Sequence, residues 1–351
     1  MLKIRKAVTK DLERILEIYA YAREVMKNSG NPDQWGDFQP PRELVEYDIS
    51  VSRAYVMEEE KIHGVFVIIE GDDPLYKSID GRWLDDGDYI SVHRIASDGE
   101  VHGIFDTAIS YAKEKYPCIR IDTYRDNKIM QKLLEKSGFT YCGIVKEEDG
   151  DPRREWQYVG LAYEWSADAI LTDRLVLRHF YMADIPDVLK IFGDEEVNKY
   201  LPWYPLKNEE EAEEFYKSRL RGKYCYAVCL RENNVPVGYI KADEDESRDV
   251  GYALRGEYQN RGIMTEAGRA LVEKLKNDGW EYITATHDRE NPKSGRVMRN
   301  IGMKYRYSYR EQWQPKNIPV VFRMYQLNLD GKDREFCRYR EMYKTDFTEE
   351  I

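Results

Sequence analysis

The sequence has few of the residues that build cross-linked, metal-bound or membrane-inserted proteins. Its 351 residues include five cysteines and five histidines, and neither a CxxC nor an HxxxH pair occurs. An odd number of scattered cysteines favours reduced thiols over a disulfide framework and argues against a structural metal site. No apolar run of membrane-spanning length and no signal-peptide core are present, so we expect a cytoplasmic protein.

Acidic residues outnumber basic ones, so the net charge is −11, and no long basic run occurs. This balance disfavours binding to nucleic acid or to a membrane surface. Two nucleotide-binding signatures are missing as well: no GxGxxG opens a helix and there is no GxxxxGK[ST]. The absences exclude a dinucleotide-dependent oxidoreductase and a P-loop ATPase. The length itself corresponds to about two average domains.

What the sequence does contain is an internal repeat. Arg5 and Asp11 in "IRKAVTKDLERILEIYA" recur with the same spacing as Arg178 and Asp184 in "LRHFYMADIPDVLKIFG". Three further pairs follow in the same order in both halves. They are the hairpin-like strands around Gly64 and Gly238, the helix entrances at Gly103–Ile104 and Gly262–Ile263, and Asn127 and Asn291, each eleven residues before a glycine, Gly138 or Gly302. Four matches in one order indicate a duplicated unit.

Each half therefore reads as one α/β unit that ends in two long antiparallel strands around a turn. We place the N-terminal unit at residues 1–160, a linker at 161–170 and the C-terminal unit at 171–330. A tail follows at 331–351. Its aromatic residues are spaced by three and four, which predicts an amphipathic helix that docks on the body or on a partner chain, with disorder as the alternative. They are Phe336, Tyr339, Tyr343 and Phe347.

The entrance of one helix indicates an anion site. Within "EYQNRGIMTEAGRALVEKL", Ala267, Leu271 and Leu275 recur every four residues and predict a helix with one buried face. Its entrance, Gln259–Met264, offers backbone N–H groups without intrahelical partners, and Gly262 allows a ligand to approach the main chain closely. A multiply charged group such as a pyrophosphate fits there. An ordinary loop-to-helix junction is the alternative.

With this order of parts, each half resembles a GNAT-superfamily N-acetyltransferase domain, and the resemblance covers nearly the whole chain. It implies two tandem α/β (α+β) folds, each with a mixed, mostly antiparallel sheet flanked by helices. The family's coenzyme motif is Gln or Arg, two variable residues, Gly, one variable residue and Gly or Ala. In the C-terminal half its six places hold Gln259, Asn260, Arg261, Gly262, Ile263 and Met264. "GIMTEA" looks like the branch that includes the ribosomal-protein N-terminal acetyltransferases.

The N-terminal copy of this motif is degenerate. Glu100 stands at the Gln/Arg place, followed by His102, Gly103 and, at the Gly/Ala place, Phe105. A carboxylate beside a pyrophosphate is repulsive, so we expect the weaker coenzyme site here. The resemblance further implies that this turn cradles the pyrophosphate of acetyl-CoA. It also implies that an Asn after the fifth strand, here Asn127 and Asn291, touches the pantetheine arm.

The resemblance also implies a main-chain N–H on the fourth strand that holds the thioester carbonyl, at Leu254 and at Ile95. Asp249 sits where related domains place an acidic residue, and it is our candidate base. The alternative is a surface carboxylate that pairs with Arg248 or another edge residue. In the N-terminal half His93 lies two residues before Ile95, so both side chains are expected on one face. A half-buried structural histidine is the alternative.

A tyrosine that many members of the family use as a proton donor is missing from both halves. Many GNAT enzymes carry a Tyr seven residues after the motif Asn, which returns a proton to the thiolate, but here these places hold Leu134 and Met298. The loops that line the acceptor in this family contain Trp35, Trp203 and Tyr204, which are candidates for an aromatic wall or, alternatively, loop anchors. With so many acidic residues, a cationic acceptor is electrostatically favoured.

The resemblance thus implies an acetyl-CoA-dependent N-acetyltransferase without a metal, as monomer or homodimer. It would move an acetyl group to a primary amine of a small molecule or peptide by direct attack, with the C-terminal half as the favoured active site. The first alternative is that both halves are active. The second is that the chain is a non-catalytic scaffold that binds acyl-CoA or another ligand.

Overall fold

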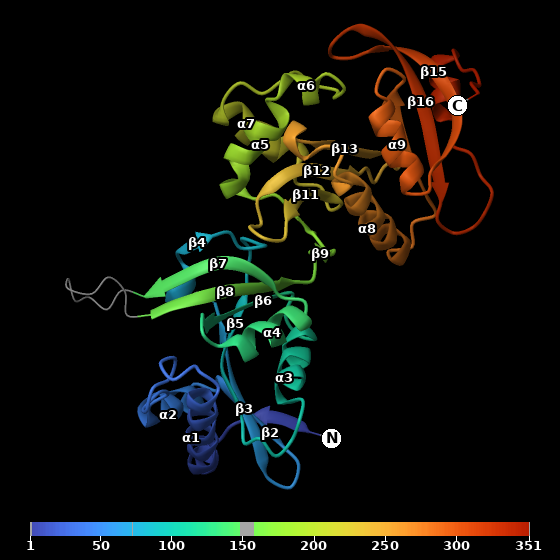
Figure 1. The fold of residues 1–351 in the computed structure, drawn as a ribbon. Helices are drawn as coiled ribbons and strands as arrows, with labels where there is room; N and C mark the ends of the chain where they lie inside the picture. Colours follow the sequence, from blue (N-terminus) through green and yellow to red (C-terminus); the bar gives the residue numbers. More distant parts are fainter. Residues whose placement is uncertain (1, 72, 148–157, 351) are drawn as a thin grey trace. The chain divides into compact units, whose positions relative to one another are not determined.

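In the computed structural model, which describes residues 2–71, 73–147 and 158–350, the chain separates into two units between Asp168 and Ala169 (Figure 1). Each unit is a mixed α/β body with its own hydrophobic core and mostly antiparallel strands flanked by helices, as predicted. Within the described ranges, every helix is too short or too polar to span a bilayer.

The N-terminal unit is built on an eight-stranded sheet with the order β1-β2-β3-β5-β6-β8-β7-β4. Its strands are β1 (Lys3–Lys6), β2 (Ala54–Glu58), β3 (Ile62–Glu70), β4 (Ile79–Gly81), β5 (Ile90–Ser97), β6 (Cys118–Tyr124), β7 (Thr140–Glu147) and β8 (Tyr158–Ser166). Its helices are α1 (Leu12–Asn28), α2 (Arg42–Ser50), α3 (Ile104–Lys113) and α4 (Lys128–Lys136), with 3-10 turns η1 (Thr9–Asp11) and η2 (Pro74–Tyr76). The turn predicted between the last two strands falls at 148–157, outside the described residues.

The C-terminal unit has two sheets, one of order β13-β12-β11-β10-β9 and one of order β14-β16-β15. Its strands are β9 (Ile170–Leu171), β10 (Leu175–Arg178), β11 (Cys225–Leu230), β12 (Pro236–Ala242), β13 (Val250–Leu254), β14 (Tyr282–Asp288), β15 (Lys304–Trp313) and β16 (Ile318–Asn328). Its helices are α5 (Ile185–Phe192), α6 (Glu195–Asn198), α7 (Glu209–Arg219), α8 (Ile263–Asn277), α9 (Pro292–Asn300) and α10 (Arg338–Tyr343), with 3-10 turns η3 (Met182–Asp184) and η4 (Gly256–Tyr258).

The two units share the order of their central strands, but β4 and β9 at the outer edges have no counterparts and the two middle strands pair differently. The run β1-β2-β3-β5 corresponds to β10-β11-β12-β13, and β6-β8-β7 corresponds to β14-β16-β15. In the N-terminal unit the parallel neighbours β5 and β6 pair at Ile90–Ile119 and Ser91–Arg120. In the C-terminal unit the bridge between Asp249, just before β13, and Thr284 of β14 takes the place of this pairing, and β13 and β14 belong to separate sheets. This separation leaves a gap between β13 and β14 in the middle of the C-terminal unit, which we call the open seam.

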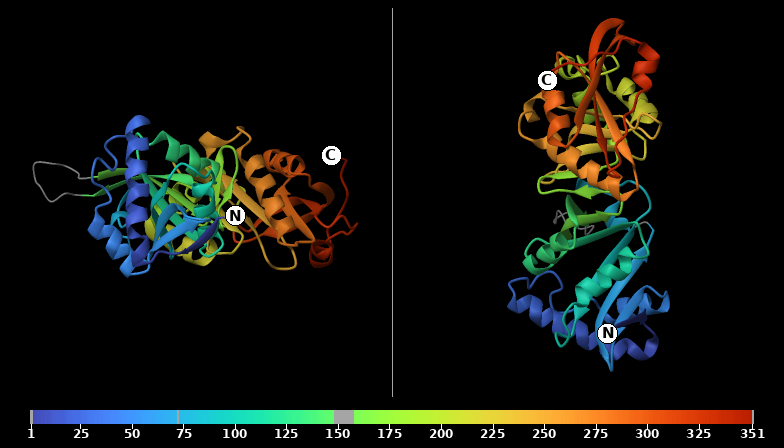
Figure 2. Two further views of the ribbon diagram at one scale, coloured as in Figure 1. Left: turned by 90° about the horizontal axis from the view of Figure 1, so that it is seen from below. Right: turned by 90° about the vertical axis from the view of Figure 1, so that its right-hand side faces the viewer.

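Helices cover both faces of the C-terminal strands (Figures 1 and 2). Neighbouring residues of β12 point to opposite faces, as strand geometry requires. Tyr239 contacts the Phe192 ring of α5 at 4.9 Å between centroids, whereas Ile240 joins the core formed with α8. α9 packs against α8 and β14. The open seam therefore lies between a layer of α5 and α7 and a layer of α8 and α9.

The repeated Arg and Asp form the same clamp at the start of each unit. Arg178 Nη1 and Nη2 lie 2.7 and 2.9 Å from the two carboxylate oxygens of Asp184, and both side chains are buried. In the N-terminal unit Arg5 pairs with Asp11 at 2.6 and 3.1 Å. In each case the Asp also accepts a backbone N–H three residues earlier and so closes the turn that starts the first helix.

We expect Asp184→Ala to lower the free energy of unfolding of the C-terminal unit by about 3–5 kcal/mol, because a buried guanidinium then has no counter-charge. Asp11→Ala is the matched control with a smaller effect, since the Arg5 side chain is 27% exposed and also pairs with Glu58. Hydrogen exchange in increasing urea, read on peptides of each unit, measures both changes. Equal losses in the two variants would contradict the role given to burial.

The linker predicted at 161–170 is wrong for most of its length. Residues up to Ser166 belong to β8, which pairs with both β6 and β7. The reason is that the stretch is a buried central strand rather than a solvated connection, with Ala162 and Tyr163 in the interior. Only three residues, 167–169, separate β8 from β9.

The tail docks on its own unit, but its helix is shorter than the aromatic spacing predicted. α10 ends at Tyr343, where Lys344 adopts a left-handed conformation with φ 52°. The chain beyond runs beside β15: Ser308 and Phe347 exchange two backbone hydrogen bonds of 2.8 Å each. The Tyr307 hydroxyl donates to the Phe336 carbonyl oxygen at 2.8 Å. The tail therefore extends the β15–β16 part of the unit.

Candidate functional site

The open seam between β13 and β14 leads into a cavity of about 950 Å³. Three separate parts of the C-terminal unit meet in its walls: the entrance of α8, the start of α9, and the strands β13 and β15. Among the residues predicted for the site, the cavity is lined by Asp249, Leu254, Gln259, Asn260, Gly262, Ile263, Met264, Asn291 and Trp203. Most C-terminal residues of the prediction thus lie around one space.

The entrance of α8 has the backbone geometry of an anion cradle. Asn260 and Gly262 adopt left-handed conformations, with φ 60° and 74°. The first intrahelical hydrogen bond runs from the Glu266 N–H to the Gly262 carbonyl at 3.0 Å, so the N–H groups of residues 263–265 precede the helical ladder. The backbone is accessible at Asn260–Gly262, while Met264 points into the core. Such a helix end attracts negative charge.

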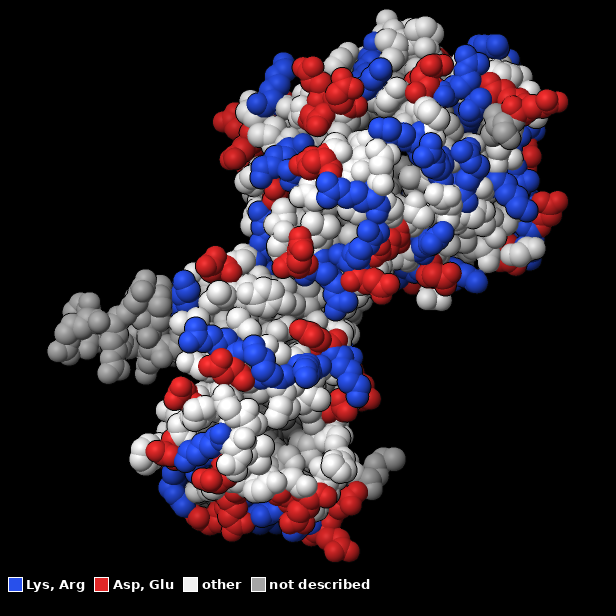
Figure 3. All heavy atoms as spheres, viewed as in Figure 1, with Lys and Arg blue, Asp and Glu red and all other residues white. Residues whose placement is uncertain are grey.

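Two cationic side chains lie beside this entrance, and one of them, Arg174, pairs with Glu266 at 2.7 Å. Arg174 Nη1 donates to the Arg261 carbonyl oxygen at 3.0 Å, and its Nη2 lies 3.6 Å from where a Cβ on Gly262 would stand. Lys293 of α9 donates to the Gln259 side chain at 3.2 Å. On the face shown in Figure 3, Lys and Arg side chains gather over the α8 and α9 region of this unit. The sequence analysis missed Arg174, because it lies far from the motif in sequence.

Asn291 caps α9 at the other side of the seam. Its side-chain oxygen accepts the Ser294 N–H at 3.4 Å, and Pro292 occupies the first helical position, which suits proline. The residue lines the cavity opposite the α8 entrance. A ligand that enters between β13 and β14 passes this amide.

Asp249 stands at the point where the two strands begin to diverge. Its Oδ1 is buried and has no hydrogen-bond partner. Burial raises the pKa of this carboxyl to about 7, the negative charge of Asp243 adds to the rise, and Lys241 opposes it. Arg248, the predicted surface partner, instead lies over the Tyr282 ring at 4.8 Å. Arg248 is therefore not the partner of Asp249, whose raised pKa lies near neutral pH.

The backbone of Leu254 faces the open seam. The Asp249 carbonyl accepts from Asp243, and the Arg255 N–H donates to Val237, so the odd-numbered residues of this strand bond to β12. Because the bonding direction alternates along an antiparallel strand, the N–H of Leu254 points away from β12. Its carbonyl oxygen accepts from the Gln259 side chain at 3.2 Å. Leu254 thus directs a main-chain donor to the side where β13 is unpaired.

Two polar groups that line the cavity were not predicted. The Tyr252 hydroxyl crosses from β13 to α9 and donates to the Ser294 carbonyl oxygen at 2.9 Å. Met298, the residue at the expected tyrosine position, is buried in the core. His287 of β14 donates from Nδ1 to the Asp288 carbonyl oxygen at 2.7 Å, which leaves a buried Nε2 without a partner. Burial lowers the pKa of His287, so the imidazole is neutral at neutral pH.

The sequence of the C-terminal unit matches a known family. Residues 174–304 fit the family model described as acetyltransferase (GNAT) domain. The uncharacterised N-acetyltransferase YnaD of Bacillus subtilis (strain 168) is 33% identical over 155 residues, which cover 43% of this chain and 88% of that protein. The chain belongs to the GNAT acetyltransferases.

Solved structures of the same family are similar to parts of this acetyltransferase. A GNAT-family acetyltransferase from Streptococcus agalactiae 2603 shares 29% identity and covers 47% of this chain and 95% of its own, with a TM-score of 0.42. One from Bacillus anthracis shares 26% identity and covers 46% of this chain and 99% of its own, with a TM-score of 0.43. GNAT acetyltransferases use acetyl-CoA as the acetyl donor.

The aromatic residues predicted for the acceptor side of the acetyltransferase have three different environments. Trp203 lines the cavity while its ring packs edge-on against Phe215 at 4.9 Å. Tyr204 is 60% exposed and lies outside the residues that line the cavity, with its hydroxyl donating to the Pro315 carbonyl oxygen. Trp35 packs edge-on against Tyr19 in the N-terminal core at 5.6 Å. Tyr204 and Trp35 anchor loops, so only Trp203 stands where an acceptor wall was predicted.

In the N-terminal unit the backbone of the acetyltransferase motif is kept while the side chains differ. Gly103 has φ 81° and accepts the first helical bond of α3 from Thr107 at 2.9 Å. His102 is exposed and Phe105 is buried in the core. Glu100, at the Gln/Arg place, pairs with Lys61 at 2.7 Å. The N-terminal entrance thus resembles that of α8 in shape but presents a carboxylate.

The amide of Asn127 is already engaged by a loop of its own unit. Its Nδ2 donates to the Gln34 side-chain oxygen at 2.8 Å, and Asn31 donates to the same oxygen at 2.7 Å. Asn127 also caps α4 by accepting the Met130 N–H. The Asn127 amide is therefore engaged by the loop between α1 and α2.

His93 and Ile95 do not share a face, which corrects the prediction. Arg94 has φ 52°, and the register of β5 against β3 shifts between Val65 and Val67, so a bulge interrupts the alternation. Ile95 packs toward the core, whereas His93 Nε2 lies 2.7 Å from an Asp73 carboxylate oxygen. His93 also stacks on Tyr76, with ring centroids 5.9 Å apart. It belongs to a half-buried polar cluster.

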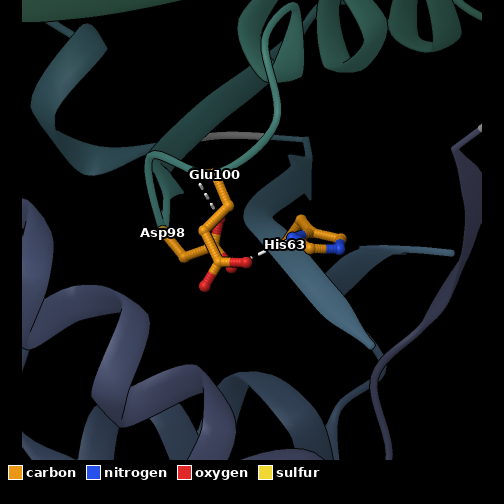
Figure 4. Close-up of side chains that lie close together, drawn as sticks. All are labelled: His63, Asp98 and Glu100. Atoms are coloured by element: carbon orange, nitrogen blue, oxygen red, sulfur yellow. Dashed lines mark hydrogen bonds and ion pairs between the residues drawn. The ribbon is translucent and has the colours of Figure 1, made fainter. Parts of the chain in front are cut away.

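One group among the described residues brings three metal-ligand atoms within 4.8 Å of one another: His63, Asp98 and Glu100 (Figure 4). Cationic side chains already pair with both carboxylates. Arg14 Nη2 lies 2.6 Å from Asp98, and Lys61 Nζ lies 2.7 Å from Glu100. A metal ion would compete with two existing positive charges, so we assign none to this group.

Proposed function

We propose that the chain is a tandem pair of GNAT domains in which the C-terminal unit alone binds acetyl-CoA and acetylates a primary amine by direct attack. One observation carries this proposal. A single cavity joins the anion cradle of α8, the Asn291 amide and a carboxylate that titrates near pH 7. These are the three functions that such a transfer needs: holding the donor, orienting it and removing a proton.

The residues of the α8 entrance fit the charged end of the coenzyme. The backbone donors of Ile263–Thr265, with Arg174 and Lys293 nearby, would hold the pyrophosphate, and Asn291 would hold the pantetheine arm. When bound, acetyl-CoA supplies the acetyl group as an activated thioester. The Leu254 N–H would donate to the thioester carbonyl oxygen as negative charge develops there.

Asp249 would accept the proton of the acceptor amine. An alkylammonium with a pKa of about 10.4 is almost fully protonated at pH 7, and an α-amine with a pKa of about 8 is largely so. An ordinary carboxyl is a weak base toward either group. A pKa of about 7 brings the basicity of the Asp249 carboxylate closer to that of the amine, while a useful fraction of the carboxyl stays ionised.

The Tyr252 hydroxyl would return a proton to the departing thiolate in place of the family's missing tyrosine. It is a hydroxyl on the cavity wall beside α9, the helix on which that tyrosine normally lies. We expect Tyr252→Phe to lower kcat about 10–100-fold, which is less than a typical general acid, because a thiol of pKa about 8.5 leaves tolerably on its own.

Tyr282→Phe is the matched control, because the Tyr282 hydroxyl also donates to a main-chain carbonyl, at 2.6 Å, but lies outside this cavity. Steady-state CoA release across pH 6–10 measures both variants. Burial raises the pKa of the Tyr252 hydroxyl above its ordinary value, so it stays protonated across this range, and a proton donor predicts that kcat falls at every pH only in Tyr252→Phe. Unchanged kcat in that variant would remove Tyr252 from the mechanism.

The N-terminal unit, in this proposal, is a GNAT fold without a working coenzyme site. The Asn127 amide donates to Gln34, and His93 hydrogen-bonds to Asp73. Glu100 places a negative charge beside the helix entrance. The resemblance of "GIMTEA" to the ribosomal-protein branch makes a peptide α-amine the second acceptor class to test.

The direct experiment is CoA release from acetyl-CoA, followed with a thiol reagent, in the presence of a panel of primary amines and N-terminal peptides. The proposal predicts release that depends on the amine and an acetylated product in mass spectrometry. Tight binding of acetyl-CoA with no release by any acceptor would favour the scaffold alternative.

A further inference from the structure

The C-terminal tail forms part of the cavity wall. Tyr339 and Tyr343 of α10 line the cavity together with Tyr309 of β15. Their rings lie nearly parallel to the Tyr309 ring, with centroids 5.2 and 5.1 Å away and interplanar angles of 21° and 11°. The tail is held in this place by the Ser308–Phe347 backbone pairing and by the ion pair of Glu349 with Arg323 at 2.5 Å.

A second carboxylate lines the same wall. Tyr309, Glu311 and Trp313 alternate along β15, and all three face the cavity, as residues two apart in a strand do. Glu311 is half-buried and accepts a hydrogen bond from the Tyr343 hydroxyl. Burial raises the pKa of Glu311. Glu311 is thus a carboxylate held by the tail rather than a solvated surface charge.

The tyrosine rings and the two carboxylates, Asp249 and Glu311, line one cavity. Besides burial, the charge of Asp249 raises the pKa of Tyr339 and Tyr309, and that of Glu311 raises the pKa of Tyr309 and Tyr343. Lys241, a cationic residue near Asp249, is paired with Asp243 at 2.7 Å. Two carboxylates in a wall lined by tyrosine rings are a site for organic cations, because carboxylates and aromatic π-electrons both attract positive charge.

We infer that β15 and the tail, through Glu311, Tyr343 and Tyr339, bind a second cationic group of the acceptor, remote from the nitrogen that is acetylated. The preferred acceptor is then an aliphatic chain that carries two protonated amines. One amine would lie at Asp249 and the other at Glu311, and the chain between them would lie along the tyrosine rings. This inference rests on the proposed function, since Asp249 marks the reacting end.

The test compares diamines of three to six carbons with the n-alkylamines of the same length. In the wild-type protein kcat/KM for the best diamine is expected to exceed that for its monoamine by at least about tenfold, as for a charge-assisted hydrogen bond. Glu311→Gln is expected to bring this ratio close to one. Glu341→Gln, which removes an exposed carboxylate of the tail helix α10 outside this cavity, is expected to keep the ratio.

A binding measurement separates this inference from the proposed function. Calorimetric titration of the diamine into the full chain saturated with CoA is expected to give a dissociation constant at least about tenfold weaker in Glu311→Gln than in Glu341→Gln. That result supports the site even if no amine is acetylated. A wild-type ratio near one, or equal behaviour of the two variants, would overturn the inference and leave the acetyltransferase assignment standing.

Discussion

Replacing Asp249 with asparagine is expected to lower kcat/KM by about 10²–10⁴-fold at pH 8, the usual contribution of a positioned general base. The wild-type rate should rise with pH through about 7 and then level, because the active form is the ionised carboxylate. Asparagine cannot titrate, so the rate of the variant should not rise with pH through about 7. Initial rates of CoA release between pH 5.5 and 9 measure both effects.

The control for this change is Glu232→Gln, which alters an exposed carboxylate in the turn between β11 and β12. It should keep both the rate and the pH profile. If Asp249→Asn instead retains most of its activity, the base is another group. His287 is then the first to test, because the residue lines the same cavity and its Nε2 has no hydrogen-bond partner.

The free energy of unfolding of Asp249→Asn should distinguish the loss of a base from damaged folding. The folded-state pKa of Asp249 is raised, so the folded protein holds a proton that the unfolded chain has already lost at pH above about 4. Stability therefore falls as the pH rises from about 4 toward about 7. Asp249→Asn removes this penalty and is expected to unfold at a higher urea concentration than the wild type at pH 8. A lower midpoint would mean that the loss of activity reflects damaged folding.

Replacing Gly262 with glutamate is expected to weaken acetyl-CoA binding by about 10²–10³-fold, whereas Gly103→Glu leaves binding unchanged. A carboxylate about 4 Å from one phosphate charge costs about 4 kcal/mol at the effective dielectric constant of a protein surface. The two glycines form a matched pair. Both precede a helix, both have a left-handed φ of 74° or 81°, and neither has a backbone neighbour that a Cβ would strike.

Because any side chain at a left-handed position costs about 1–2 kcal/mol of conformational energy, the charge must be separated from the strain. Gly262→Ala introduces the strain alone and should weaken binding far less than the glutamate. Calorimetric titrations of the three variants give the comparison. Loss of binding in Gly103→Glu but not in Gly262→Glu would move the coenzyme site to the N-terminal unit.

The parts of the site that the sequence predicted are those encoded locally. The α8 entrance follows from a glycine and a stripe of apolar residues within twenty positions, and the Asn291 cap from an amide three residues before the N–H it accepts. The repeated order of Arg5–Asp11 and Arg178–Asp184 predicted the shared framework, because each clamp closes within one turn. Short-range geometry of this kind is visible in a single sequence.

The residues that escaped prediction act across long sequence distances. Arg174 meets the α8 loop from before β10, and Tyr252 reaches α9 from β13. The aromatic spacing of the tail predicted a docking helix, but not its contact with Tyr309. The bulge at Arg94 was also missed, because alternation assumes a regular strand. None of these contacts leaves a periodic signal. They become visible only when strand order and register are known.

The most direct test of the account is the number of acetyl-CoA molecules that the wild-type chain binds, measured by calorimetric titration at known protein concentration. We predict one site per chain, located in the C-terminal unit where the α8 cradle and Asn291 face the open seam. Two sites per chain would contradict the inactive role given to the N-terminal unit. No binding would contradict the assignment of the cavity to the coenzyme altogether.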